Sequence, residues 1–177
     1  MGTEGGSLMS DVDSAILQIN MRFPPNKPVR VAVYCRIDEN RQDQASDFEL
    51  QERYYYEIIA KQSNWICSGL YVDEGFKCRD QFNAMLTDAK AGKFDLIISK
   101  SVSRFCRNTV ESISIIRDLL GLKNPVGVYF ETEGLNTLQP QAEFLLTILL
   151  TLVEVESEKR SKTAKLSWQT RKERDRK

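Results

Sequence analysis

Four arginines stand next to segments that are predicted to be strands or helices, where they could act together on one anion. A guanidinium group is planar, permanently charged and able to donate two parallel hydrogen bonds, which suits a phosphate and its transition state. Isolated arginines are usually solvated surface residues, whereas four at one sheet edge would favour an anion site. They are Arg36, Arg79, Arg104 and Arg107.

Histidine is absent from the 177 residues, which restricts the chemistry that the chain can perform. Its absence excludes Ser-His and Cys-His relays and every metal site that needs an imidazole ligand. The cysteines form no C-x-x-C pair, so we expect neither a zinc ribbon nor a disulfide framework. The four are expected to be small core residues: Cys35, Cys67, Cys78 and Cys106.

Charge is segregated along the chain, although the 25 basic and 25 acidic residues cancel in total. Residues 159–177 contain nine basic and two acidic residues, a net charge of +7, which leaves −7 on residues 1–158. A basic end commonly contacts nucleic acid or an anionic surface, and a solvated helix end is an equally good explanation. The candidate phosphate contacts are Lys159, Arg160, Lys162, Lys165, Arg171 and Lys172.

The composition fits one folded domain with appendages. Hydrophobic residues make up 41% and charged residues 28%, which excludes a disordered tail. No run of 18 apolar residues occurs, so we expect no ordinary membrane-spanning helix. The first residues, MGTEGGS, are acidic and glycine-rich, unlike a secretory signal, and a cytoplasmic protein is expected.

Strands and helices are predicted to alternate between residues 29 and 131. Short apolar runs rich in β-branched residues predict strands at 29–35, 65–72, 94–99 and 126–131. Apolar residues at helical spacing, together with cap signals, predict helices at 46–62, 80–91 and 108–120. The alternation predicts an α/β fold, with a mainly parallel four- to five-stranded sheet flanked by helices.

In such a sheet, the working site lies beyond the carboxyl ends of the strands. Polar clusters fall at these ends, with residues 36–39 after the first strand, 73–74 after the second and 100–107 after the third. These positions indicate a functional site, although charged loops at strand ends are also common without function.

Segments of different character flank this unit, which divides the chain into residues 1–28, 29–137 and 138–177. Ile16, Leu17 and Ile19 predict an amphipathic helix over 11–23, followed by a proline-rich linker at 24–28. From Pro140 to residue 176 no glycine or further proline occurs, which predicts a helix of roughly 55 Å at ~1.5 Å per residue. Its first half is apolar on more than one face, so we expect a partner subunit there, with the basic end in solvent or on DNA.

Several motifs together resemble the catalytic domain of the serine recombinases (resolvases and invertases), most of all the large serine recombinases of phages and conjugative transposons. The resemblance spans about residues 29–163, and the order and spacing of its motifs make it specific. It includes VAVYCRI at 31–37, YVDEG at 71–75, FDLII at 94–98 and SVSRFCRN at 101–108. It extends to Phe82, Met85, Leu86, Glu131 and the segment 135–137.

The resemblance implies a resolvase-like catalytic domain over residues 29–137 that cuts and rejoins double-stranded DNA. In this family a serine hydroxyl attacks the phosphodiester, forms a 5′-phosphoseryl bond and frees a 3′ hydroxyl. Homodimers joined by the long helix assemble into a synaptic tetramer, whose subunits rotate. The family implies no metal, no cofactor, no small-molecule substrate and no membrane, in a cytoplasmic, nucleoid-associated protein of bacterial or phage origin.

The same resemblance assigns roles to the arginines. Arg36 would bind the scissile phosphate. Arg104 and Arg107 match the S-R-x-x-R pair that stabilises the transition state and assists protonation of the leaving group. Arg79 matches the arginine that follows the D-x-x-S-G loop of the family.

Two further residues are matched with an alternative left open for each. Asp73 matches the acidic residue of the D-x-x-S-G loop, and helix capping or a loop salt bridge would explain it equally well. Gln51 matches a glutamine of the first helix that shapes the active site, and a solvated helix position is equally consistent.

Asp38 occupies the position of the nucleophilic serine, two residues after Arg36. A carboxylate is a poor nucleophile toward a phosphodiester anion, and the acyl phosphate it would form hydrolyses readily. Asp38 would instead pair with Arg36, Arg104 or Arg107, so we expect the chain to be deficient in DNA cleavage. Ser46, eight residues further on, is expected to lie too far away.

Two other departures concern the surroundings of the site. Only three residues separate Gly75 from Arg79, fewer than in the family, and the Ser-Gly of the loop is missing, which affects the placement of Arg79. No helix-turn-helix or cysteine-rich ribbon follows the basic end. The chain is therefore expected to be either an excised catalytic domain or a stand-alone remnant.

Two other functions are compatible with parts of the sequence. A recombinase fold without its nucleophile could serve as a regulatory or architectural partner that dimerises through the long helix and binds DNA through the basic end. A doubly wound signalling domain with an aspartate phosphoacceptor would need an acidic residue at the end of the third strand. The sequence there is Ser99-Lys100-Ser101, which disfavours that function.

Overall fold

A five-stranded sheet forms the centre of the computed structural model, which describes residues 23, 27–37, 44–75, 78–105, 109–142, 144–148 and 151. The strand order is β2-β1-β3-β4-β5. β1 to β4 run parallel, and β5 runs antiparallel to β4, which confirms the predicted mainly parallel sheet. The strands are β1 (Val29–Ile37), β2 (Trp65–Glu74), β3 (Leu96–Ser99), β4 (Gly127–Phe130) and β5 (Leu135–Asn136).

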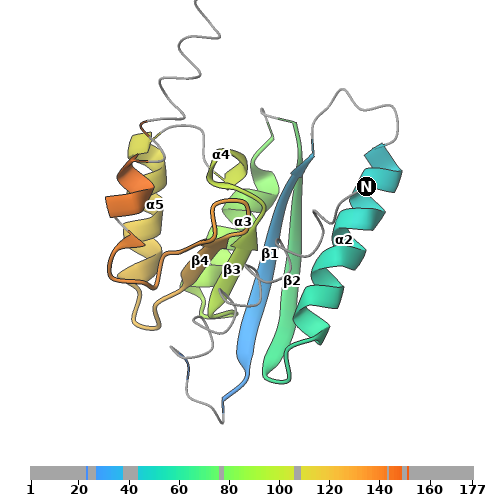
Figure 1. The fold of residues 1–177 in the computed structure, drawn as a ribbon, viewed down its shortest axis with the longest axis horizontal. Coiled ribbons are helices and arrows are strands. Elements are labelled where there is room, and N and C mark those ends of the chain that lie inside the picture. Colours follow the sequence, from blue (N-terminus) through green and yellow to red (C-terminus); the bar gives the residue numbers. More distant parts are fainter. Residues whose placement is uncertain are drawn as a thin grey trace, which may run out of the picture.

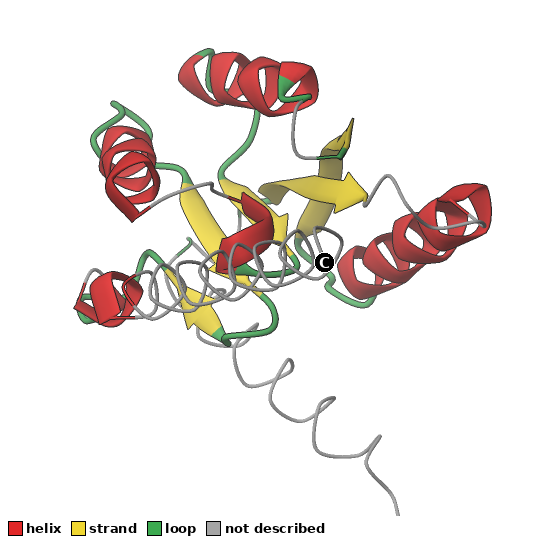
Figure 2. Cartoon of the chain, turned by 90° about the horizontal axis from the view of Figure 1, so that it is seen from above, coloured by secondary structure: helices red, strands yellow, loops and turns green. Residues whose placement is uncertain are grey.

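Helices cover both faces of the sheet (Figure 1), as the strand–helix alternation predicted. α2 covers one face, while α3, α4 and α5 lie on the other. Seen from above, the strands lie between these two sets of helices (Figure 2). The helices are α2 (Gln44–Ala60), α3 (Asp80–Lys90), α4 (Val102–Phe105) and α5 (Thr109–Leu120).

β1 is buried on both faces, which explains why its sequence is an almost continuous apolar run. Val31 and Val33 pack in the core on the α2 face, whereas Ala32 and Tyr34 pack in the core on the α3 and α5 face. Because side chains alternate along a strand, Arg36 shares the face of Tyr34. The strand therefore places Arg36 on the side of α3 and α4, at its carboxyl end.

The two elements missing from the sequence-based prediction are both short. α4 lies within the segment that was predicted as a loop after the third strand, and β5 pairs with β4 over only two residues. Neither is long enough to show a hydrophobic period. All four predicted strands and all three predicted helices of the central unit are present, and each end lies within two residues of its predicted position.

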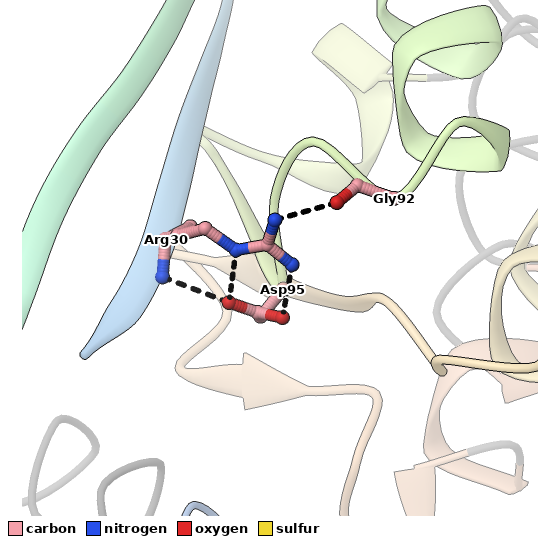
Figure 3. A network of polar contacts seen from close by, with 3 residues as sticks. All are labelled: Arg30, Gly92 and Asp95. Atoms are coloured by element: carbon pink, nitrogen blue, oxygen red, sulfur yellow. Dashed lines mark hydrogen bonds and ion pairs between the residues drawn. The ribbon is translucent and has the colours of Figure 1, made fainter. Parts of the chain in front are cut away.

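Arg30 and Asp95 join the amino-terminal ends of β1 and β3 (Figure 3). The Nε of Arg30 donates to Oδ2 of Asp95 at 3.0 Å, its Nη2 donates to Oδ1 at 2.8 Å, and its Nη1 donates to the carbonyl of Gly92 at 2.6 Å. Burial opposes ionisation of Asp95, but the hydrogen bonds from Arg30 outweigh it and lower the pKa of the carboxyl. This network stabilises the sheet edge opposite the predicted site.

The start of the predicted long helix is present, because residues 142, 144–148 and 151 are helical. Ala142 and Leu146 are buried in the core, whereas Phe144 is 69% exposed and Leu145 and Ile148 are also exposed. The rest of that helix, with the six basic candidates, lies outside the described residues, as does the predicted amphipathic helix before Phe23. In the part of the chain that is described, no helix is long and apolar enough to cross a membrane.

Candidate active site

The carboxyl ends of β1, β2 and β3 meet at one edge of the sheet, where the polar residues gather. Arg36 is the penultimate residue of β1 and pairs in register with Asp73 of β2. Both side chains belong to the buried part of the molecule, with Arg36 at 9% exposure and Asp73 at 1%. The segment after β3 carries Ser101 and Arg104 to the same edge. The parallel topology thus brings together residues from three separate motifs.

Hydrogen bonds to backbone carbonyls join the segments of Arg36 and Arg104, although these residues are 68 positions apart in sequence. The Nη2 of Arg36 donates to the carbonyl of Ser103 at 3.0 Å, and the Nη1 of Arg104 donates to the carbonyl of Arg36 at 3.1 Å. These two hydrogen bonds end on neutral carbonyl oxygens, and they fix the positions of the two guanidinium groups. The arrangement places two cationic side chains side by side at the end of β1.

α4 is a single turn whose start is capped from two directions. Ser101 accepts the backbone N–H of Arg104 on its hydroxyl at 3.3 Å and on its carbonyl at 3.2 Å. Both carboxylate oxygens of Glu133 accept the backbone N–H of Val102 at 3.3 Å. Burial raises the pKa of Glu133, partly opposed by these bonds. The caps fix the turn that presents Arg104, and the motif SVSR is therefore a structural as well as a chemical signal.

Asp73 caps α3 from a neighbouring strand. Its Oδ1 accepts the backbone N–H of Gln81 at 3.0 Å, and its Oδ2 accepts the backbone N–H of Phe82 at 3.0 Å. The Tyr34 hydroxyl donates to Oδ2 at 3.1 Å, and the Cys78 thiol lies 3.6 Å from Oδ1. Arg79, at the N-cap position itself, makes no side-chain cap bond. The sequence left open a site role, a helix cap or a loop salt bridge for Asp73. The contacts in the structure are those of a helix cap.

Arg79 has a different environment from the Arg36–Arg104 pair. Its Nη1 makes a short hydrogen bond and ion pair with Glu111 of α5. Its guanidinium carbon lies 4.1 Å from the centroid of the Phe82 ring. The buried Nη2 of Arg79 has no hydrogen-bond partner among the described residues. Arg79 is thus partly neutralised by Glu111, and its buried Nη2 is left without a hydrogen bond from the described residues.

An aromatic cluster lies beneath these polar residues and joins the elements that carry them. The ring centroids of Tyr34 and Phe82 are 5.0 Å apart, those of Phe82 and Phe105 are 5.0 Å apart, and those of Tyr34 and Phe105 are 6.0 Å apart. Burial, then the charge of Asp73, raises the pKa of Tyr34, which keeps its hydroxyl protonated as a donor. The cluster links β1, α3 and α4 into one support.

Three of the predicted site residues are not brought to this group by any described contact. Gln51 is a partly buried residue of α2, and in the described part of the chain no contact joins it to Arg36, Arg79 or Arg104. Asp38 and Arg107 lie outside the described residues. Sequence reasoning missed Glu111 and the supporting role of Tyr34, because no local pattern reveals the partner of an arginine on another helix.

A second polar cluster lies on the α2 face of the same sheet edge, around Glu131 at the end of β4. The Tyr55 hydroxyl donates to Oε2 of Glu131 at 3.1 Å, and the Tyr54 hydroxyl makes a short hydrogen bond to Oε1. The Nζ of Lys100 lies 3.6 Å from Oε2. Glu131 is only 8% exposed, so this carboxylate is satisfied by two hydroxyls and one ammonium group. Among the described residues, no cluster of acidic or cysteine side chains could hold a metal ion.

Comparison with known proteins gives one family and several related folds. The family model described as the resolvase N-terminal domain matches residues 31–177. The crystal structure of the N-terminal catalytic domain of TP901-1 integrase is 22% identical, with a TM-score of 0.51 over 73% of this chain and 97% of that one. A resolvase family site-specific recombinase from Streptococcus pneumoniae is 23% identical, with a TM-score of 0.56 over 80% of this chain and 97% of that one. No curated protein matches the sequence.

Proposed function

Since this chain belongs to the resolvase family, we propose that it is the catalytic domain of a site-specific serine recombinase acting on double-stranded DNA. We further propose that the chain as it stands is deficient in DNA cleavage, because Asp38 takes the place of the nucleophilic serine. The catalytic unit in this proposal comprises residues 29–137, with an appendage at 1–28 and a dimerisation and DNA-contacting segment at 138–177.

The observation that supports the proposal is the pair of hydrogen bonds that joins the segments of Arg36 and Arg104 at the end of β1. Two guanidinium groups fixed next to each other can bind the non-bridging oxygens of one phosphodiester and stabilise the added charge of its transition state. Arg107, three residues after Arg104, and the remaining donor atom of Arg79 would complete the phosphate cage. Asp73 would act indirectly, because it fixes the start of α3 next to Arg79.

The reaction needs a nucleophile two residues after Arg36. A serine hydroxyl there would form a bond to phosphorus while the bond from phosphorus to the 3′ oxygen breaks, and a proton would pass to that oxygen. Asp38 offers a carboxylate instead, which repels the phosphate and bonds to phosphorus only as a labile acyl phosphate. The arginines would then bind DNA without cutting it, and Gln51 would have no serine to orient.

The test replaces Asp38 with serine and, as the matched control, with alanine. Each protein is incubated with supercoiled plasmids that carry random inserts, because the target site is unknown, and nicked DNA and covalent protein–DNA adducts are measured on denaturing gels. We expect adducts only with Asp38→Ser. Adducts formed by the unaltered protein would contradict the proposed deficiency.

A second candidate function is that of a regulatory or architectural DNA-binding partner with the same fold. Asp38 favours this function, because an aspartate at the position of the serine removes the nucleophile, while the hydrogen bonds that join Arg36 and Arg104 are present. This function predicts that Asp38→Ser stays inactive although it binds DNA as well as the unaltered chain. The same experiment therefore separates a disabled recombinase from a module with another role.

A further inference from the structure

Arg79 and Glu111 form an ion pair between two helices that cover the same face of the sheet. Arg79 stands at the N-cap of α3, and Glu111 lies in the first turn of α5. The Nη1 of Arg79 donates to Oε1 of Glu111, across 32 positions of sequence. Both helices follow strands that run parallel, so their first turns lie at the carboxyl ends of these strands. The ion pair therefore lies at the edge of the sheet that carries the candidate site.

The guanidinium group of Arg79 is mostly enclosed. Its side chain is 16% exposed, and its guanidinium carbon lies 4.1 Å from the centroid of the Phe82 ring. Its Nη2 is buried, whereas its Nη1 pairs with a glutamate side chain that is 35% exposed. Of these two nitrogen atoms, an anion from solvent would therefore approach Nη1. The carboxylate of Glu111 already occupies that position.

Tyr34 connects Arg79 to the arginine at the end of β1. The ring centroids of Tyr34 and Phe82 are 5.0 Å apart, and Arg79 lies over the Phe82 ring. Burial, then the charge of Asp73, raises the pKa of the Tyr34 hydroxyl. The positive charges of Arg36 and Arg79 both oppose that rise, so both guanidinium groups act on the same hydroxyl. Arg79 therefore belongs to the same cationic group as Arg36.

A carboxylate and a phosphate compete for a guanidinium group, because both offer negatively charged oxygen acceptors. A mostly enclosed guanidinium group without an anion is costly, so Glu111 stabilises Arg79 while no phosphate is present. A phosphate that shared Nη1 with Glu111 would be repelled by the carboxylate. The partly exposed side chain of Glu111 can turn toward solvent, where the N-terminus of α5 still favours its negative charge.

We propose that Glu111 is an internal substitute for a DNA phosphate, which pairs with Arg79 in the free protein and releases it when DNA binds. The inference rests on the proposed function, because it takes the arginine group to be the phosphate site. Glu111 would lower the affinity of this site for DNA. The exchange would also make the start of α5 respond to the presence of DNA.

The test measures the affinity of the full chain for a labelled DNA duplex by fluorescence anisotropy at one salt concentration. We expect Glu111→Gln to raise the affinity about two- to fivefold, since an amide holds a guanidinium group less strongly than a carboxylate does. Asp118→Asn is the matched control, because it removes the same charge from the exposed last turn of the same helix. Arg79→Met should lower the affinity and abolish the gain from Glu111→Gln.

A gain no larger than that of Asp118→Asn, or a loss of affinity, would overturn the inference, because Glu111 would then not compete with DNA. An equal gain from Glu111→Gln in the Arg79→Met chain would also overturn it, because the gain would then follow net charge. An unchanged affinity of Arg79→Met alone would contradict the place of Arg79 in the proposed site, and the inference would fall with it.

Urea denaturation shows whether each variant folds. Arg79→Met keeps an unbranched side chain over the Phe82 ring, and Arg79→Gln replaces it in the test if it does not fold. If neither variant folds, the comparison of Glu111→Gln with Asp118→Asn decides. A larger gain for Glu111→Gln supports the exchange, and an equal or smaller one opposes it.

Discussion

The arginines at the carboxyl ends of the strands are fixed by different contacts. Arg36 donates to the carbonyl of Ser103, and Arg104 donates to the carbonyl of Arg36. Arg79 instead pairs with the carboxylate of Glu111. An ion pair with a carboxylate weakens the attraction of an arginine for phosphate. The pair with Glu111 is therefore expected to weaken the contact of Arg79 with a phosphate.

Asp73→Asn is expected to lower the free energy of unfolding by about 1–3 kcal/mol. The amide has one acceptor oxygen instead of two, so the N–H of Gln81 or of Phe82 loses its partner, and so does the charge assistance to the Tyr34 hydroxyl. Urea denaturation measures the change. Glu74→Gln, at the exposed neighbouring position, is the control and should have little effect. Equal stability of both variants would argue against the cap.

The sequence predicted that Arg36 and Arg104 lie at the same end of the sheet, but it did not predict which groups they contact. Arg36 and Arg104 come together because the ends of parallel strands share an edge, and the alternation of strands and helices predicts this edge. The sequence could not decide whether Asp73 has a role in the site or caps a helix, because the answer depends on which backbone N–H groups face its carboxylate. That information arises only when α3 packs beside β2.

At the scale of elements, Glu131 connects α2 to the end of β4. Tyr54 and Tyr55 come from the middle of α2, and both donate to the same carboxylate. α2 follows the segment that contains Asp38, so its position determines where that segment ends. The connection therefore bears on the geometry of the site, although Glu131 lies on the opposite face of the sheet from Tyr34 and Arg36.

The two tyrosines should make the domain sensitive to alkaline pH. Burial, then Glu131, raises the pKa of both hydroxyls above the value of about 10 in an unfolded chain. Above pH ~10 the unfolded state loses protons that the folded state keeps, so the free energy of unfolding falls as pH rises. Tyr54→Phe with Tyr55→Phe should flatten this fall. Denaturant titrations at pH 8, 10 and 11 (roughly the window set by the unfolded pKa) measure it.

The control for that experiment is Tyr56→Phe, which removes a hydroxyl from the exposed part of the same helix. Its effect on the pH dependence should be much smaller, because Tyr56 makes no bond to Glu131 in the described structure. An equally steep loss of stability in the double variant and in the unaltered chain would show that other groups cause the alkaline effect.

Strands and long helices could be predicted because burial leaves a period in the sequence. β1 reads as a continuous apolar run since both of its faces are covered, and α3 shows Phe82, Met85 and Ala89 at helical spacing because one face is buried. The sequences of α4 and β5 are too short to show such a period. Their conformation depends on tertiary caps, such as the bond from Val102 to Glu133, and on pairing of β5 with β4.

Over the whole molecule, a network of polar contacts lies at each end of the sheet. The Arg30–Asp95 network joins the amino-terminal ends of β1 and β3, while the arginine pair lies at the carboxyl ends. The apolar side chains at the start of the last helix point outward from this body. A second copy of the chain can cover them, which is consistent with the proposed dimer.

Phe144→Glu with Ile148→Glu is expected to shift the protein from dimer toward monomer in light-scattering measurements over a range of concentrations. Burying each apolar side chain at an interface contributes about 1.5–3 kcal/mol, and burying a carboxylate there is costly. Leu50→Glu, an equally exposed change on α2, is the control and should leave the mass unchanged. A dimer that persists in the double variant would place the interface elsewhere.

The basic segment is expected to bind DNA through phosphates and with little preference for sequence. Neutralising n contacts should make the slope of log affinity against log salt less steep by about 0.9n. Three replacements should therefore reduce the slope by roughly 2.7. Fluorescence anisotropy with a labelled duplex at several salt concentrations measures it, on a chain with the changes Lys159→Gln, Lys162→Gln and Lys165→Gln.

The matched control removes the same charge from the folded body, at three exposed lysines far apart in sequence. If the acidic body makes no phosphate contacts outside the arginine pair, this triple variant should keep the slope of the unaltered chain, because only contacted phosphates release counterions. A loss of slope in both variants would mean that the effect follows net charge rather than position, and the basic segment would then not be the contact surface. The control changes are Lys61→Gln, Lys90→Gln and Lys123→Gln.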